Sequence, residues 1–187
     1  MTDADDRALL LEIARDAVIA HVTRKGGAER PAPHDGIPGD LASRRGGAFV
    51  TIHHRGELRG CIGHIEPDQL LVRIVAQCAA SACSADPRFP PIAADELADI
   101  DVELSLLGPL ESILGPDDIE IGRHGLLIAR DSRRGLLLPQ VATEWKWDAL
   151  TFLAQTCRKA GLPIDAWKRG AEVWRFEAEI FGEKLRT

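Results

Sequence analysis

Hydrophobic positions recur at helical spacing in three long stretches of the chain. In residues 3–23, five apolar positions fall on one stripe of a helix: Leu9, Leu10, Ile13, Ala17 and Ala20. Residues 69–84 are mostly apolar and small, which is typical of a well-buried helix. Residues 148–160 lie between a capping Asp and a terminating Gly and predict a third helix. We expect two shorter helices as well, at residues 94–98 and 139–147.

Alternating polar and apolar positions predict strands, most of which come in hairpins. Residues 48–54 and 57–63 are joined by Arg55-Gly56, a sequence typical of a tight turn. The remaining predicted strands are a second hairpin and two single strands: residues 125–129 with 135–138, then 101–107 and 172–181. Hairpins outnumber strand–helix–strand units, so we predict an α+β fold, with a mostly antiparallel sheet and helices packed on it.

Two segments interrupt the periodic pattern. Residues 25–47 contain six Gly and three Pro without periodicity, which predicts a long surface loop of the kind that often carries function. Residues 86–91, Asp-Pro-Arg-Phe-Pro-Pro, must end the helix before them, because prolines cannot continue it.

Composition narrows the class of protein without naming a reaction. The chain has 187 residues, 23 Lys and Arg against 29 Asp and Glu, and a formal net charge of −6. That length fits one domain, or two small lobes that share a core. The negative charge argues against general nucleic-acid binding, which needs a basic surface. With five Phe, four Trp and no Tyr, an aromatic base-stacking platform is disfavoured too.

The cysteines indicate a reducing compartment. They form no CxxC pair and are too few for a disulfide scaffold: Cys61, Cys78, Cys83 and Cys157. The acidic start of the chain is the opposite of a basic signal sequence. No apolar run approaches the roughly 18 residues of a membrane-spanning helix. We therefore expect a cytoplasmic protein with reduced thiols and no membrane partner.

Residues 58–63, Leu-Arg-Gly-Cys-Ile-Gly, are the most informative segment. On a regular strand Arg59 and Cys61 point to the same face, and a guanidinium beside a thiol stabilises the nucleophilic thiolate. Gly60 and Gly63 leave the backbone open to a ligand or to another chain segment. The alternative interpretation is a buried structural cysteine beside a glycine bulge.

Four further residues are candidates for chemistry. Asp86 and Arg88 flank Pro87 in a rigid turn, where the arginine could clamp a carboxylate or phosphate, or the two could bond the local backbone. Glu103 lies on a predicted strand and needs a partner if it is buried. His124 lies in a glycine turn and could act as acid or base, or be merely solvated.

These residues form two candidate sets. The candidate catalytic residues are Cys61, Arg59, Glu103 and His124. The candidate ligand-binding residues are Gly60, Gly63, Asp86 and Arg88. We predict no metal, because the histidines near Cys61 lack zinc-ligand spacing and two of them are sequence neighbours that face opposite ways on a strand. No cofactor is predicted, since the sequence has neither a GxGxxG loop nor a P-loop.

Five segments, taken in order, resemble the AMMECR family: residues 58–63, 86–91, 122–126, 135–141 and 159–162. The RGCIG motif of the first segment is highly specific to that family. The resemblance runs from about residue 5 to 181, and the chain looks like a whole member of the prokaryotic branch, called AmmeMemoRadiSam system protein A.

The resemblance implies a fold and partners, and leaves the reaction open. It implies a single AMMECR domain over residues 1–187, made of a larger and a smaller lobe with a cleft near the RGCIG strand. It also implies two partners, a Memo-like protein related to metal-dependent extradiol dioxygenases and a radical S-adenosylmethionine enzyme.

Three hypotheses for function follow. In the first, Cys61 is a reactive thiol, Arg59 tunes it or holds an anionic substrate, and Glu103 or His124 moves protons. In the second, the protein is a non-catalytic interaction module for the two partners, using the loop and the acidic stretch 95–120. In the third, scattered arginines bind nucleic acid weakly and with a steep salt dependence. We favour a catalytic or substrate-handling role.

Overall fold

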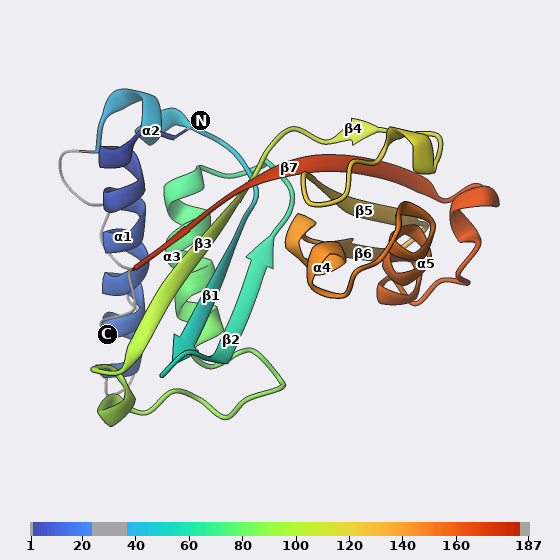
Figure 1. Cartoon of the computed structure of the whole chain (residues 1–187). Coiled ribbons are helices and arrows are strands. Elements are labelled where there is room, and N and C mark those ends of the chain that lie inside the picture. Colours follow the sequence, from blue (N-terminus) through green and yellow to red (C-terminus); the bar gives the residue numbers. More distant parts are fainter. Residues whose placement is uncertain (1, 24–36, 184–187) are drawn as a thin grey trace. The chain divides into compact units, whose positions relative to one another are not determined.

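The computed structural model describes residues 2–23 and 37–183, which form two compact units (Figure 1). The first unit comprises Met1–Leu106 and Glu179–Thr187, and the second comprises Leu107–Ala178. The last strand, β7 (Glu172–Gly182), contributes its start to the second unit and its end to the first. The first unit is therefore built from both ends of the chain.

A three-stranded antiparallel sheet forms the centre of the first unit. Its middle strand is β1, and the three strands are β1 (Ala48–His54), β2 (Glu57–His64) and β3 (Ile100–Leu107). The end of β7 follows β3 in the strand order. Beyond it, the Glu183 N–H donates to the Val102 carbonyl at 3.0 Å, and the Glu183 carboxylate accepts from the Val102 N–H at 2.9 Å.

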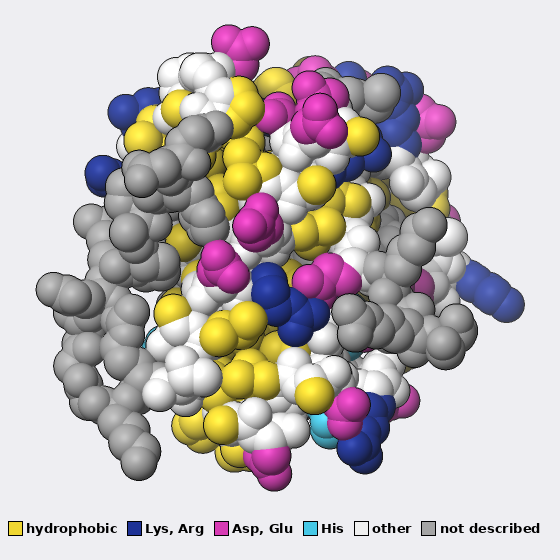
Figure 2. All heavy atoms as spheres, turned by 90° about the vertical axis from the view of Figure 1, so that its left-hand side faces the viewer, with side chains coloured by type: hydrophobic (Ala, Val, Ile, Leu, Met, Phe, Trp, Pro, Cys, Tyr) yellow, Lys and Arg dark blue, Asp and Glu magenta, His cyan; other side chains and the backbone are white. Residues whose placement is uncertain are grey.

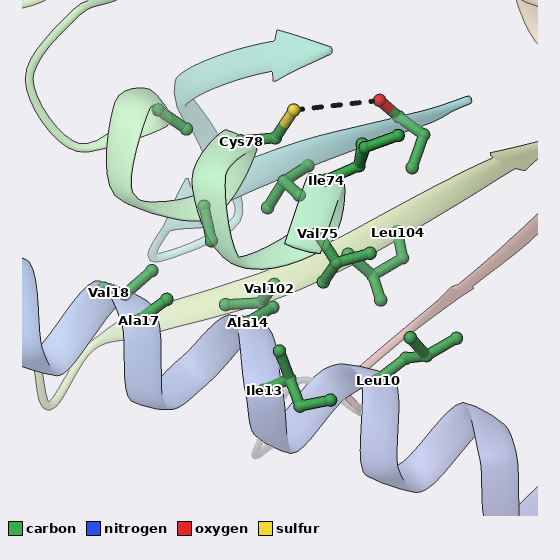
Figure 3. Packing of buried hydrophobic residues seen from close by; sticks show 14 of the residues in the cluster. Leu10, Ile13, Ala14, Ala17, Val18, Ile74, Val75, Cys78, Val102 and Leu104 are labelled. Carbon is green, nitrogen blue, oxygen red and sulfur yellow. Dashed lines mark hydrogen bonds between the residues drawn. The ribbon is translucent and has the colours of Figure 1, made fainter. Parts of the chain in front are cut away.

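Helices α1 (Ala4–Thr23) and α3 (Leu71–Ala82) supply the core on one face of this sheet (Figure 3). Their buried side chains meet alternate residues of β1 and β3, among them Leu10, Ile13, Ala17, Ile74, Val75, Cys78, Val50, Ile52, Val102 and Leu104. Because side chains alternate along a strand, Thr51 and Glu103 lie on the opposite face. A short helix, α2 (Gly39–Ser43), and a 3₁₀ turn, η1 (Ala94–Glu96), complete the described part of the unit.

The second unit has its own sheet and core. Strand β5 pairs with β6 and with the start of β7, and β4 also pairs with β7. Its elements are β4 (Glu111–Ser112), η2 (Pro116–Asp118), β5 (His124–Arg130), β6 (Arg133–Leu137), α4 (Pro139–Glu144), α5 (Ala149–Lys159) and η3 (Ala166–Lys168). Helix α5 begins where the Asp148 carboxylate accepts the Thr151 N–H at 2.7 Å. Its apolar face is buried against β5: Phe152, Leu153 and Cys157 against Leu126 and Ile128.

The predicted α+β class with its antiparallel pairing is confirmed, and the departures from the predicted elements are local. The predicted loop over residues 25–47 contains helix α2, while residues 24–36 lie outside the described part of the chain. Helix α4 ends at Glu144 rather than near residue 147, because Lys146 adopts a left-handed conformation (φ 53°). The N–H of Trp147 then bonds back to the Ala142 carbonyl, which closes the helix end. Among the described residues, no helix is long and apolar enough to span a membrane.

Strand β6 passes so close to the end of α5 that only glycine fits at Gly135. A Cβ added there would fall on the backbone of Ala160. We expect Gly135→Ala to lower the free energy of unfolding by roughly 1–3 kcal/mol, because the strand or helix must shift. Urea unfolding followed by tryptophan fluorescence measures this effect. Gly115→Ala, in open space within the same unit, is the control, and equal losses in both variants would contradict the packing argument.

Candidate functional site

A β-bulge at Arg59 decides which way the RGCIG strand faces. Along β1 and β2, His53 is opposite Leu58 but Ile52 is opposite Gly60, so Arg59 is an extra residue without a partner. An inserted residue reverses the facing of everything beyond it. The prediction that Arg59 and Cys61 share a face assumed a regular strand. Because of the bulge, that alternation no longer holds between these two residues.

Cys61 lies on the face of the sheet opposite α1 and α3. Its cross-strand partner is Thr51, whose hydroxyl donates a hydrogen bond to the Cys61 sulfur at 3.4 Å. The neighbours of Thr51 on β1, Val50 and Ile52, are both fully buried in the core on the other face. Cys61 is therefore a partly exposed thiol with a hydroxyl donor, rather than a core cysteine.

The other three cysteines are buried thiols. Burial raises the pKa of Cys78 to about 11 and that of Cys83 to about 12. Burial also raises the pKa of Cys157, in the core of the second unit. All four cysteines are free, so the prediction of unpaired thiols agrees with the structure, and Cys61 alone is partly accessible.

Glu103 belongs to the same cross-strand row as Cys61. In the register of the sheet, Cys61 is opposite Thr51, and Thr51 is in turn opposite Glu103 on β3. Side chains in one row project from the same face. The structure thus places two of the predicted catalytic residues in one row, on strands about 10 Å apart. Thr51, which sequence reasoning missed, lies between them.

Arg59 holds the proline-rich segment against the edge strand. Its guanidinium donates to both carboxylate oxygens of Glu96, at 2.8 and 3.0 Å, and to the carbonyls of Pro90 and Pro91, at 2.7 and 3.2 Å. The Arg59 hydrogen bond, followed by the Ala93 N–H, lowers the pKa of Glu96 to about 2. Hydrogen bonding to Glu96 raises the pKa of Arg59 in return. Every hydrogen bond that the structure gives the Arg59 side chain therefore goes to this segment.

Asp86 joins the backbone of Cys61 to the side chain of Arg88. One of its oxygens accepts the Cys61 N–H at 2.9 Å and the Arg88 Nη2 at 2.7 Å, and the other accepts the Arg88 Nε and backbone N–H at 2.9 and 3.1 Å. These bonds, led by that of the Arg88 side chain, hold the pKa of Asp86 far below its usual range. Hydrogen bonding to Asp86 raises the pKa of Arg88, and the nearby Cys61 contributes to the same shift.

The glycines of the motif are in close contact with other parts of the first unit. A Cβ on Gly60 would fall on the carbonyl oxygen of Ala82 in α3, and one on Gly63 would fall on the ring of Phe49. Of the two alternatives in the sequence, a ligand or another chain segment, the structure shows a chain segment beside each glycine.

His124 belongs to the second unit, at the start of β5. Its Nδ1 accepts the Glu120 backbone N–H at 2.9 Å, so Nε2 carries the proton of the neutral ring. Burial, and then the charges of Arg175 and Arg123, lower the pKa of His124. The ring is therefore neutral at pH 7, and any proton transfer by His124 must use Nε2.

Two other kinds of site have little support in the described residues. No group of three or more His, Cys, Asp and Glu side chains is arranged to hold a metal ion within residues 2–23 and 37–183. The arginines considered for nucleic-acid binding are Arg44, Arg45, Arg55, Arg59, Arg133 and Arg134. The first five donate hydrogen bonds to other groups of the protein, and Arg134 also has an interaction partner. On the face that carries α1, basic side chains are interspersed with acidic and hydrophobic ones (Figure 2).

The structure defines an α+β protein with a partly exposed thiol on an antiparallel sheet. The model of the AMMECR1 family matches residues 11–181, and the chain belongs to this family. It is 46% identical over 186 residues to a protein of Methanothermobacter thermautotrophicus, covering 96% of this chain and 95% of that one. It is 44% identical over 186 residues to protein TK0174 of Thermococcus kodakarensis, covering 94% and 89% of the two chains.

The fold recurs in a solved structure of the same family. The crystal structure of PH0010 from Pyrococcus horikoshii, described as an uncharacterized protein, matches with a TM-score of 0.84 and 39% identity. The match covers 95% of this chain and 91% of that one. The predicted family and fold class are thereby confirmed. The cleft expected beside the RGCIG strand stays a prediction.

The contact of Glu96 with Arg59 makes stability depend on pH. The pKa of Glu96 in the folded protein, about 2, lies below that of an unfolded glutamate, about 4.3. Its contribution is therefore complete above about pH 5 and is lost as the pH falls toward 2. We expect Glu96→Gln to lower the free energy of unfolding by roughly 2–3 kcal/mol at pH 7. Its deficit relative to the wild type should shrink as the pH is lowered.

Urea unfolding between pH 7 and pH 3 measures this deficit. Asp95→Asn changes a neighbouring exposed acid of the same turn and is the control, with an expected effect within about 0.5 kcal/mol. A deficit for Glu96→Gln that stays constant with pH would show that the charge of Glu96 adds no stability.

Proposed function

We propose that Cys61 is the reactive group of a thiol-dependent, substrate-handling site on the first unit. The observation that carries the proposal is the bulge at Arg59, which turns this thiol away from the core and opposite Thr51. A protein that needed only a packing residue here would gain nothing from exposing it, because free cysteines pack well as small apolar side chains. Reduced thiols of this kind fit the cytoplasm, which we propose as the location.

The row of Cys61, Thr51 and Glu103 supplies the groups for nucleophilic attack. The thiol proton would pass to water, which could relay it to the Glu103 carboxylate in the same row. The thiolate would then form a bond from sulfur to an electrophilic carbon of the substrate, while the bond from that carbon to its leaving group breaks and the leaving group departs with the electron pair. The Thr51 hydroxyl donates to the sulfur and so stabilises its charged form. Gln in place of Glu103 would remove the proton acceptor while keeping the side-chain shape.

Alkylation of the native protein by iodoacetamide tests this proposal. We expect Cys61 to be modified first at pH 7, and several-fold faster than in the urea-unfolded chain, since only the folded protein supplies the Thr51 donor. Thr51→Val should remove that advantage, whereas Thr51→Ser, which keeps the hydroxyl, should retain it. Peptide mass spectrometry identifies the modified cysteine and its rate.

The buried Cys157 provides the matched control. Cys61→Ser should abolish the fast reaction, and Cys157→Ser should leave it unchanged. If native Cys61 reacts no faster than in the unfolded chain, or is protected until unfolding, the thiol has no special reactivity and the proposal is wrong.

A docking role beside the Memo-like protein and the radical S-adenosylmethionine enzyme is the second candidate. Its support is the concentration of exposed apolar side chains on the second unit: Leu110, Leu114, Ile121, Trp145, Leu150 and Ile164. Leu114 is 95% exposed and Trp145 is 67% exposed. The ring of Trp145 stacks on that of Trp147, with 6.0 Å between the ring centroids. Large aromatic side chains of this kind are enriched where proteins bind one another. Such a docking role fits the assignment of this chain to the branch called AmmeMemoRadiSam system protein A.

Titration calorimetry with each purified partner from the same genome tests the docking role. We expect micromolar binding that Trp145→Ser weakens at least tenfold, because central aromatic residues dominate interface energies. Ile19→Ser, at a 41% exposed apolar position on α1 of the first unit, is the control and should bind normally. Absence of binding to either partner at micromolar concentration would exclude this role.

A further inference from the structure

Arg88 is held along one edge of its guanidinium and exposed along the other. The Nε and Nη2 atoms donate to the two oxygens of Asp86, at 2.9 and 2.7 Å. The side chain of Arg88 is 54% exposed, and within the described residues its Nη1 has no hydrogen-bond acceptor. Three of the five N–H donors are thus left, and two of them, one on Nη1 and one on Nη2, point in parallel and can bind a ligand.

Asp86 fixes the direction of that fork. The carboxylate is only 3% exposed, and it also accepts the N–H groups of Cys61 and Arg88. A guanidinium held by a buried and fully bonded carboxylate loses little conformational freedom when it binds a further group. The ring of Phe89, 5.4 Å from the guanidinium carbon, supports the arginine from another side.

The same carboxylate places the fork beside the backbone of the proposed nucleophile. The Cys61 N–H and the Arg88 Nη2 share one Asp86 oxygen, at 2.9 and 2.7 Å. Arg59, on the same strand as Cys61, is not equivalent, because its side chain is only 13% exposed and is bound to Glu96 and two carbonyls. Arg88 is therefore the guanidinium that remains available to a molecule at Cys61.

We propose that Arg88 binds an oxyanion, the carboxylate or phosphoryl group of a substrate whose electrophilic carbon is presented to Cys61. This inference rests on the proposed reactivity of Cys61 and names the class of substrate it takes. Arginine forks match the geometry of both oxyanions and bind them through two parallel hydrogen bonds. A chain with a net charge of −6 otherwise repels such molecules.

Two alkylating agents of similar size but different charge test the inference. Iodoacetate carries a carboxylate, and iodoacetamide carries a neutral amide in its place. We expect Arg88→Gln to lower the ratio of the iodoacetate rate to the iodoacetamide rate at Cys61 by about tenfold, since a charged hydrogen bond is lost. Arg88→Lys keeps the charge without the fork, so its rate ratio should lie between that of the wild type and that of Arg88→Gln. The ratio cancels any general change in the exposure of Cys61.

Arg55→Gln is the matched control. Arg55 also donates Nε and Nη2 to a carboxylate, that of Asp99, but it lies at the turn of the hairpin, away from Cys61 in the register. Its loss should leave the ratio unchanged. An unchanged ratio in Arg88→Gln would overturn the inference and leave the reactivity of Cys61 standing. A Cys61 that is inert to both agents would instead overturn the proposed function.

Protection experiments distinguish the two oxyanions. Millimolar inorganic phosphate or malonate is added while iodoacetamide reacts with the wild type and with Arg88→Gln. Protection of Cys61 by phosphate, or by malonate, in the wild type alone supports the inference and assigns the phosphoryl or the carboxylate group. Equal rates with and without both anions would overturn it.

Discussion

The facing of Cys61 depends on one inserted residue. Counted from the turn at Arg55-Gly56 without a bulge, Cys61 would be opposite Val50, a fully buried core residue, and its sulfur would point into the core. The bulge at Arg59 moves the partner to Thr51, and the thiol to the opposite face. Period-two alternation makes this change complete, because no intermediate facing exists on a strand. The candidate site exists only with this bulge.

The bulge is held in place by the segment that follows α3. Arg59 and Glu96 form one clamp between the strand and that segment, and Asp86 with the Cys61 N–H forms another. The second clamp gives an acceptor to the Cys61 N–H, a donor at the edge of the sheet that would otherwise be open to pairing with another chain. Because Asp86 also orients Arg88, the contacts that stabilise this edge are the ones that shape the proposed oxyanion site.

Burial separates the four cysteines into two chemical kinds. Cys78 and Cys83, on and just after α3, have pKa values raised to about 11 and 12 and stay protonated at neutral pH. Cys157 fills the core of the second unit in the same way. Cys61 differs only in the face it occupies and in its hydroxyl neighbour. Exposure on the face of the sheet away from the helices is therefore the property that distinguishes the thiol for which a substrate-handling role is proposed.

Local patterns in the sequence determined the helices, the hairpins and the α+β class, because periodicity and turn residues act over a few neighbours. They also pointed to Cys61, Asp86 and Arg88, since unusual residues in a glycine- and proline-rich setting stand out in any sequence. Only the tertiary structure decided that Arg59 donates its hydrogen bonds to Glu96, and that the Thr51 hydroxyl donates to the Cys61 sulfur. Those partners depend on a bulge and on a segment more than thirty residues away in sequence, and no local pattern encodes either.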